Sequence, residues 1–299
     1  MIIPVVDPLK SPPSTEEAFR FCEKVTYAHY ENFPVASFLI PADKRRHICA
    51  IYAFARTADD FADEPGLTAP ERIEHLNRWE KDLDDCYQHE PNGPVFVALR
   101  ETISQYSIPR DLLSNLLQAF KSDVTTNRYE TFADVLRYCI HSANPVGRLV
   151  LLLFGYRDEM LMKLSDCICT ALQLTNFWQD VTVDLGKDRV YLPLEDLRRF
   201  GVTEHQLKAR SSTPEFRKML EFEVGRTRNL FLDGKPLLNL VGKNLRRELR
   251  FTWLGGMQIL KKIEKIRYDV FTKRPKLRFY DKVVLVSRVL FPLNYEPSH

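Results

Sequence analysis

The sequence lacks the short motifs that mark several large enzyme classes. Its 299 residues contain no Gly-x-Gly-x-x-Gly fingerprint, no P-loop and no His-Glu-x-x-His pair. A nicotinamide site, a P-loop phosphate site and a helix-borne zinc site are therefore not indicated. Nothing in the chain points to a nucleophile elbow either.

The chain also has little that would suit a secreted or membrane-spanning protein. Its six cysteines form neither a Cys-x-x-Cys pair nor a metal-ligand spacing, so we expect reduced core residues of a cytosolic protein. The N-terminal segment has no basic region followed by a long apolar stretch, so no signal peptide is expected. The densest apolar run, 149–154, is far too short to span a bilayer. We expect a cytoplasmic protein, either soluble or peripheral to the inner face of the membrane.

Neither sign of charge dominates the whole chain. Lys and Arg number 43 against 40 Asp and Glu, a net charge of +3, which does not indicate a nucleic-acid partner. Residues 241–282, however, carry thirteen Lys and Arg against four Asp and Glu. This segment is either a solvated helical face or a surface that meets anionic lipid or a phosphorylated substrate.

Glycine is scarce, with 11 residues, and prolines fall between segments of helical periodicity. There is no strictly alternating run, no strand–helix–strand pattern and no internal repeat. The sequence therefore predicts a single all-α domain over residues 1–299. The expected helices span about 14–31, 42–63, 131–141, 145–154, 157–184, 195–210, 213–232, 239–270 and 276–291, with others beginning near Pro70, Pro94 and Pro109.

Two stretches far apart in the chain repeat oxygen-bearing side chains every four residues. The first carries Asp59 and Asp63, and the second carries Asn176, Asp180 and Asp184. Positions i and i+4 share a helix face, so each stretch presents a row of oxygen ligands. Two facing rows would hold hard divalent cations such as Mg²⁺ or Mn²⁺, and the ions would hold a diphosphate.

Each row also has a simpler explanation. An Asp-rich helix end before Pro65 is often a solvated terminus, and the second row could be the wet face of its helix. The second row, extended by Gln173, contains only amides and aspartates, without the Lys and Glu typical of a solvated face, which favours a metal role. Arg56, on the face of Asp59, either binds a phosphate oxygen or pairs with Asp60.

Aromatic residues lie on or near the same segments. Most aromatics pack in protein cores, but these would also suit a dry cavity whose ring faces stabilise a carbocation. They are Phe33, Phe38, Tyr52, Phe54, Tyr138, Phe177, Trp178 and Tyr191. Arg189 and Tyr191 belong either to a loop that closes on phosphate or to an exposed turn between helices.

Residues from about 29 to 274 resemble the squalene/phytoene synthase family. The stretch 50–63 is similar to the first family signature, and the stretch 173–193 is similar to the second. The resemblance implies the isoprenoid (class I terpenoid) synthase fold, a single helical bundle around a central cavity. It implies that Mg²⁺ is bound by Asp59, Asp63, Asn176, Asp180 and Asp184. It also implies that substrate or diphosphate is touched by Arg56, Gln173 and Tyr138, with Tyr268 and Arg274 completing the diphosphate pocket.

Two departures from the family pattern fall on diphosphate contacts. Most members have Ile-Leu-Arg after the Asn of the second signature, whereas this chain has Phe177, Trp178 and Gln179, so an amide replaces a cation. Near the N-terminus the family often has His-Ser-x-Ser-Phe, and this chain has His29-Tyr30-Glu31-Asn32-Phe33. The variant Asn-Phe-Trp-Gln-Asp resembles the hydroxysqualene synthase (HpnC-type) branch of bacterial hopanoid biosynthesis.

That branch implies one prenyl diphosphate substrate, presqualene diphosphate. Diphosphate would leave with the help of Mg²⁺, and water, positioned by Gln179, would capture the rearranged carbocation to give hydroxysqualene without NADPH. The same resemblance implies that substrate could be channelled between this protein and other squalene-pathway enzymes. Two alternatives stay open: a head-to-head condensing prenyltransferase that makes presqualene diphosphate, squalene or phytoene, and a catalytically silent member that acts as an assembly protein.

Overall fold

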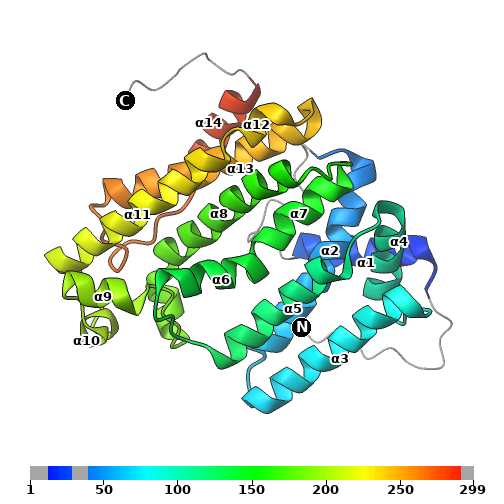
Figure 1. Cartoon of the computed structure of the whole chain (residues 1–299), viewed down its shortest axis with the longest axis horizontal. Coiled ribbons are helices and arrows are strands. Elements are labelled where there is room, and N and C mark those ends of the chain that lie inside the picture. The colour runs from blue at the N-terminus through cyan, green and yellow to red at the C-terminus, as the bar shows by residue number, and fades with distance from the viewer. Residues whose placement is uncertain (1–12, 29–39, 291–299) are drawn as a thin grey trace. The chain divides into compact units, whose positions relative to one another are not determined.

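The computed structural model describes residues 13–28 and 40–290, and most of these residues are helical (Figure 1). Within these ranges there is no β-strand, and one isolated bridge joins Arg128 to Val190. The predicted all-α class is therefore confirmed. The helices fall into two compact units, one within residues 1–126 and 145–157 and the other within residues 127–144 and 158–299. The single domain expected from the sequence stays a prediction.

The first unit is built around α2 (Ala42–Asp63), which packs against four other helices. These are α1 (Thr15–Ala28), α3 (Ala69–Gln88), α4 (Pro94–Tyr106) and α5 (Arg110–Thr125), and the unit also holds most of α7 (Asn144–Leu153). The ring of Phe54 on α2 is fully buried and stacks on Trp79 of α3. Because this side of α2 is fixed in the core, the polar side chains of its last turns are left on the opposite side.

The second unit is built around α8 (Glu159–Gly186), which packs along α11 (Pro214–Gly234) and also contacts α13 (Lys243–Lys265). Figure 1 shows these three long helices side by side. The other helices are α6 (Phe132–Ser142), α9 (Leu194–Phe200), α10 (Glu204–Lys208), α12 (Leu237–Leu240) and α14 (Phe279–Leu290). Gly256 of α13 lies directly on the ring of Phe231, since a Cβ there would be 2.4 Å from its Cζ atom. Close packing of α13 against α11 therefore requires glycine at this position.

Two helices predicted in the second unit have the wrong bounds. The helix expected over 195–210 is two helices, because α9 ends at Gly201, whose φ of 72° is left-handed, and Thr203 caps α10. The helix expected over 239–270 begins at Lys243 and ends at Lys265. Arg267 and Tyr268 have positive φ values of 54° and 60°, which a right-handed helix cannot continue. This second break begins the loop that carries Arg274.

Most of the cysteines lie in the core, as expected, whereas Cys167 and Cys169 are partly exposed. All six cysteines are free thiols, and Cys22, Cys49, Cys86 and Cys139 are buried. Burial raises the pKa of the Cys86 thiol to about 12, which keeps it protonated and unreactive.

In the described part of the chain, no helix combines the length and apolar character needed to cross a membrane.

Candidate functional site

The first acidic row occupies the last two turns of α2 in the first unit. Asp59 and Asp63 are half-buried, one turn apart. The Arg56 guanidinium donates to the Oδ2 atom of Asp59 at 2.9 Å and also to a carboxylate oxygen of Asp60. Of the two roles considered for Arg56, the structure shows the ion pair, and it includes Asp59 as well as Asp60. One turn before Arg56, burial raises the pKa of the half-buried Tyr52.

The second row runs along the outer side of α8 in the second unit. Asn176 is exposed, and Asp180 and Asp184 are half-buried, whereas Phe177 and Trp178 between them are buried. The helix therefore separates its oxygen-bearing stripe from its apolar side, as the four-residue spacing predicts. Gln173, one turn before Asn176, and Gln179, next to Asp180, are both half-buried.

The loop after α13 brings a predicted diphosphate ligand to this row. The Arg274 guanidinium donates two hydrogen bonds to the Asp180 carboxylate, one of them from Nη2 to Oδ2 at 2.8 Å. These bonds raise the pKa of Arg274, so the side chain stays a cation. Tyr268, at the start of the same loop, is placed elsewhere: its hydroxyl donates to Glu221 of α11 at 3.4 Å.

Four aromatic rings cluster at the end of this row. The rings of Phe177 and Tyr191 are stacked face to face, with centroids 3.7 Å apart and 8° between their planes. Tyr138 of α6 contacts both rings, at 5.9 Å and 5.6 Å between centroids. Tyr129 stacks on Tyr191 at 5.6 Å. The structure thus brings together three of the predicted cavity residues.

Tyr129 was not predicted from the sequence. It enters the cluster because its segment runs along the loop after α8: the Tyr129 carbonyl accepts a hydrogen bond from the Leu194 amide at 2.9 Å. The only local signal was its place just before the Thr131 helix cap, which says nothing about its distant partners.

A pocket in the second unit joins the acidic row to the aromatic cluster. Its lining combines predicted site residues with aliphatic ones: Phe177, Val181, Asp184, Leu185, Arg189, Val190, Tyr191, Leu192 and Leu207. A carboxylate, a guanidinium and two stacked rings therefore share one wall of side chains.

Trp178 has a different environment from its neighbour Phe177. It is fully buried, and its indole Nε1 donates to the hydroxyl of Thr227 on α11 at 2.7 Å. The Thr227 hydroxyl in turn donates to the Glu223 carbonyl at 2.8 Å. Trp178 therefore anchors α8 in the core of the second unit, the alternative role considered for these aromatics.

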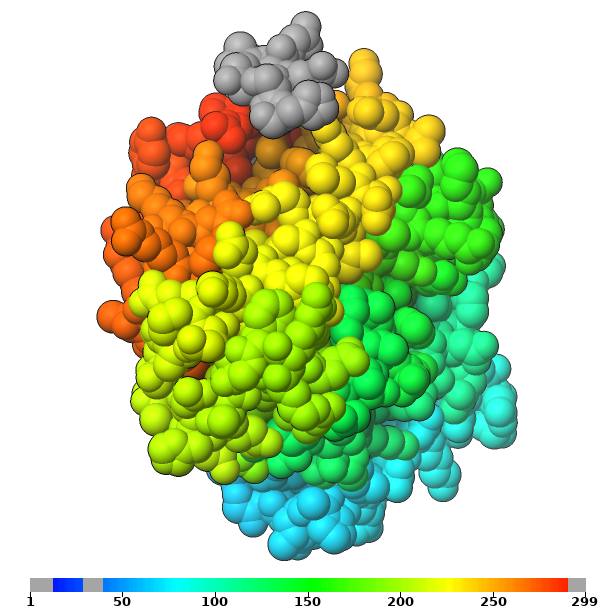
Figure 2. All heavy atoms as spheres, turned by 60° about the vertical axis from the view of Figure 1, so that its left-hand side comes forward, coloured from blue at the N-terminus to red at the C-terminus, as the bar shows by residue number. Residues whose placement is uncertain are grey.

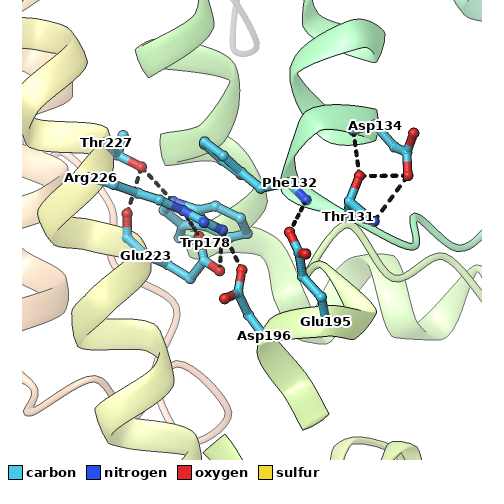
Figure 3. Close-up of polar contacts among 9 residues, drawn as sticks. All are labelled: Thr131, Phe132, Asp134, Trp178, Glu195, Asp196, Glu223, Arg226 and Thr227. Atoms are coloured by element: carbon cyan, nitrogen blue, oxygen red, sulfur yellow. Dashed lines mark hydrogen bonds and ion pairs between the residues drawn. The ribbon is translucent and has the colours of Figure 1, made fainter. Parts of the chain in front are cut away.

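A buried cluster of titratable side chains lies beside this anchor (Figure 3). Arg226 donates to the two carboxyl oxygens of Glu223 at 2.7 Å and 2.5 Å and to Asp196 of α9 at 2.8 Å. Its guanidinium also covers the Phe132 ring of α6, 3.4 Å from the centroid. Because Glu223 is completely buried, its pKa is raised to about 8 despite the nearby Arg226 cation. The cluster ties α6, α9 and α11 together and was not predicted from the sequence.

The predicted site residues are thus divided between the two units. Asp59, Asp63, Arg56 and Tyr52 belong to the first, and the α8 row, the aromatic cluster and Arg274 belong to the second. Among the described residues, no group of three His, Cys, Asp or Glu side chains forms a metal-binding cluster. Phe33 and Phe38 lie outside the described residues.

Comparison with known proteins gives consistent matches. The family model of squalene/phytoene synthases matches residues 26–281. A hydroxysqualene synthase of Rhodopseudomonas palustris is 38% identical over 69% of this chain and 70% of its own. A 15-cis-phytoene synthase of Synechocystis is 30% identical over 87% of this chain and 81% of its own. The crystal structure of the squalene synthase HpnC from Alicyclobacillus acidocaldarius superimposes with a TM-score of 0.81 at 38% identity, covering 86% of this chain and 97% of that one.

Proposed function

Because this chain belongs to the squalene/phytoene synthase family, we propose that it converts presqualene diphosphate to hydroxysqualene. Two observations support this reaction over others in the family. Hydroxysqualene synthases are 36–38% identical to this chain, although over a shorter stretch than the phytoene synthases. The observation that carries the proposal is Gln179, a neutral side chain where most of the family has a cation in the second signature.

The oxygen-bearing rows fit a divalent cation by their chemistry. The rows consist of carboxylates and one amide, and none of these side chains is fully buried. Oxygen atoms of this kind are the ligands that Mg²⁺ or Mn²⁺ prefers. The proposed ligands are Asp59 and Asp63 on the row of the first unit, and Asn176, Asp180 and Asp184 on the row of the second. When bound, the cation would offset the charge of a departing diphosphate as a Lewis acid.

The cationic side chains of the site would bind and orient the diphosphate. Arg274 donates to both carboxylate oxygens of Asp180, and Arg189 lines the pocket beside Asp184. Arg56 is held in the same way by Asp59 and Asp60. We infer that these guanidinium groups exchange part of their carboxylate hydrogen bonds for phosphate oxygens when substrate binds.

The aromatic cluster would hold the organic part of the substrate. After the carbon–oxygen bond to diphosphate breaks, the carbocation would lie against the face of Phe177 that Tyr191 does not cover, with Tyr138 and Gln173 also touching substrate. Gln179 would orient one water molecule through its amide. The water oxygen forms the new carbon–oxygen bond and releases one proton, so no reductant such as NADPH is consumed.

A two-substrate assay with full-length protein tests this reaction. With Mg²⁺ and without NADPH, presqualene diphosphate should give hydroxysqualene, and the carbinol oxygen should come from ¹⁸O-labelled water. Farnesyl diphosphate alone should give no product. Formation of presqualene diphosphate or squalene from farnesyl diphosphate, or of phytoene from geranylgeranyl diphosphate, would establish the condensing alternative instead.

A matched pair of variants tests the role of Gln179. The Gln179→Ala variant should lose hydroxysqualene relative to products that arise without water capture, and Gln118→Ala, an exposed glutamine of α5, should behave as wild type. Unchanged rate and product in Gln179→Ala would remove Gln179 from the mechanism.

Ligand binding can be measured separately from turnover. Mg²⁺ with inorganic diphosphate should raise the melting temperature, since a ligand at about 100 times its Kd stabilises the folded state by about 2.7 kcal/mol. EDTA or Asp180→Asn should abolish the shift, and the exposed Asp111→Asn should retain it. A wild-type protein that shows no shift would favour the catalytically silent alternative.

A further inference from the structure

The first turns of α14 expose an unusual number of large apolar side chains. Phe279 is 83% exposed, Tyr280 is 76% exposed and Val283 is 49% exposed. The helix is nevertheless anchored, because Leu285 and Val289 are buried. These exposed side chains therefore belong to a docked helix and gather within two turns at its N-terminal end, and the red atoms of α14 lie at the molecular surface in Figure 2.

Cations surround these apolar side chains. Lys276, Arg278 and Lys282 are exposed, and the structure of the described residues records no ion pair for any of them. The acid of the segment, Asp281, is already engaged by the Lys262 ammonium at 2.6 Å and by the Arg278 amide at 2.7 Å. The surface formed by these three cations with Phe279, Tyr280 and Val283, called the α14 surface below, therefore carries a net positive charge.

We propose that the α14 surface binds an anionic lipid membrane. Aromatic and aliphatic side chains ringed by Lys and Arg match the boundary between lipid headgroups and acyl chains, where rings insert and cations meet phosphate. The proposal concerns attachment to the bilayer surface and does not depend on which reaction the protein catalyses.

A second copy of the chain fits this surface less well. A two-fold dimer through α14 would bring the same patch of each protomer together, so the cations of Lys276, Arg278 and Lys282 would face their own counterparts. Facing like charges oppose association. An anionic bilayer instead offers the opposite charge and an apolar interior to the same six side chains.

Vesicle flotation with full-length protein tests the proposal. The probe is phosphatidylcholine vesicles containing about 30% phosphatidylglycerol, compared with pure phosphatidylcholine, because each Lys or Arg near an anionic surface adds about 1 kcal/mol. We expect binding to the anionic vesicles only, and weaker binding as NaCl rises from about 0.1 M to about 1 M. Equal binding to neutral vesicles, or none to anionic vesicles, would overturn the proposal.

Two variants separate the charged and the apolar contributions. Lys276→Gln/Arg278→Gln/Lys282→Gln should lower the affinity for anionic vesicles about 100-fold, given about 1 kcal/mol for each cation. Phe279→Ser/Tyr280→Ser should also weaken binding, with the salt dependence retained. The controls are Lys24→Gln/Lys163→Gln/Lys218→Gln and Tyr27→Ser/Ile140→Ser. They make the same number of substitutions of the same kind at exposed residues elsewhere.

The comparison with these controls decides the result. If either control variant weakens binding as much as its α14 counterpart, the α14 surface is not the contact. If wild type is a dimer by light scattering and Phe279→Ser/Tyr280→Ser makes it a monomer, the surface is covered by a second copy and the membrane proposal is wrong.

Discussion

The indole Nε1 of Trp178 lies 2.7 Å from the hydroxyl oxygen of Thr227, and this hydrogen bond joins α8 to α11 at a point where Trp178 has no exposed surface. The Thr227 hydroxyl uses both of its roles there, since it accepts from the indole and donates to the Glu223 carbonyl. No water can replace either partner without opening the core. The pair is therefore a sensitive measure of how firmly α8 is held.

Removing either partner should destabilise the protein. Trp178→Phe and Thr227→Val should each lower the free energy of unfolding by about 1–3 kcal/mol, because a buried polar group is left without its partner. The double variant should lose less than the sum of the two losses. Urea unfolding measures these values, with Thr227→Ser as the control that keeps the hydroxyl. Strict additivity of the two losses would show that the hydrogen bond contributes nothing.

Glu223 predicts a pH dependence of stability. Burial raises the pKa of its carboxyl from 4.5 to about 8 in the folded protein. Between these values the folded state keeps a proton that the unfolded chain releases. Rising pH therefore favours unfolding, and this group lowers the free energy of unfolding by up to about 1.4 kcal/mol per pH unit across that window. The stability it contributes is complete below pH 4.5 and is lost as pH approaches 8.

The Glu223→Gln variant should remove this contribution, because an amide does not titrate. Urea unfolding between pH 5 and pH 8 should show a flatter dependence for Glu223→Gln than for wild type. Glu215→Gln, which changes an exposed carboxyl at the start of the same helix, should retain the wild-type slope. Parallel curves for wild type and Glu223→Gln would contradict the assignment.

The two hydrogen bonds between Arg274 and Asp180 predict a catalytic effect. Arg274→Gln should lower kcat/KM for presqualene diphosphate about 10- to 100-fold, because losing one hydrogen bond from the guanidinium to a phosphate oxygen costs about 1.5–3 kcal/mol. Arg274→Lys should fall between wild type and Arg274→Gln, since an ammonium keeps the charge but loses the planar fork. The exposed neighbour Lys273 gives the control, Lys273→Gln, which should keep wild-type activity. Wild-type kcat/KM in Arg274→Gln would exclude Arg274 from the site.

The stacked pair of Phe177 and Tyr191 predicts an effect on the organic intermediate. Phe177→Leu keeps an apolar side chain but removes a ring face, which is worth about 0.5–2 kcal/mol to a cation. We expect a slower reaction and a larger share of early-quenched products by gas chromatography with mass spectrometry. Phe200→Leu removes a half-buried ring of α9, outside the cluster, and should leave the products unchanged. An unchanged product spectrum in Phe177→Leu would show that the ring does not face the carbocation.

The sequence was informative wherever a contact is local. The bounds expected for the second helix, 42–63, agree with α2, because apolar periodicity and the following Pro65 and Gly66 mark both its face and its end. The polar stripe of α8 follows from its four-residue spacing in the same way. Periodicity acts through neighbouring turns, so it reports the faces of a helix reliably, whereas the end of α2 was marked by the breakers Pro65 and Gly66.

Contacts between distant segments could not be derived from spacing. Arg226 binds Asp196, 30 residues away, and nothing local distinguishes it from the exposed arginines of the chain. The same is true of Tyr129, which joins the aromatic cluster through backbone pairing with the loop after α8. The break at Gly201 was missed because one glycine inside a periodic stretch is compatible with either a continuous helix or a left-handed end.

The Trp178 anchor also determines the rotation of α8 about its own axis. Successive residues of a helix are turned by about 100°, so a slip of one position would carry the oxygen row a quarter-turn or more from its present direction. Trp178 lies between Asn176 and Asp180, and its indole nitrogen has a single acceptor on α11. A residue buried away from any ligand therefore sets the direction in which three ligand side chains point. The direction of the oxygen row is therefore set by core packing on the opposite side of α8.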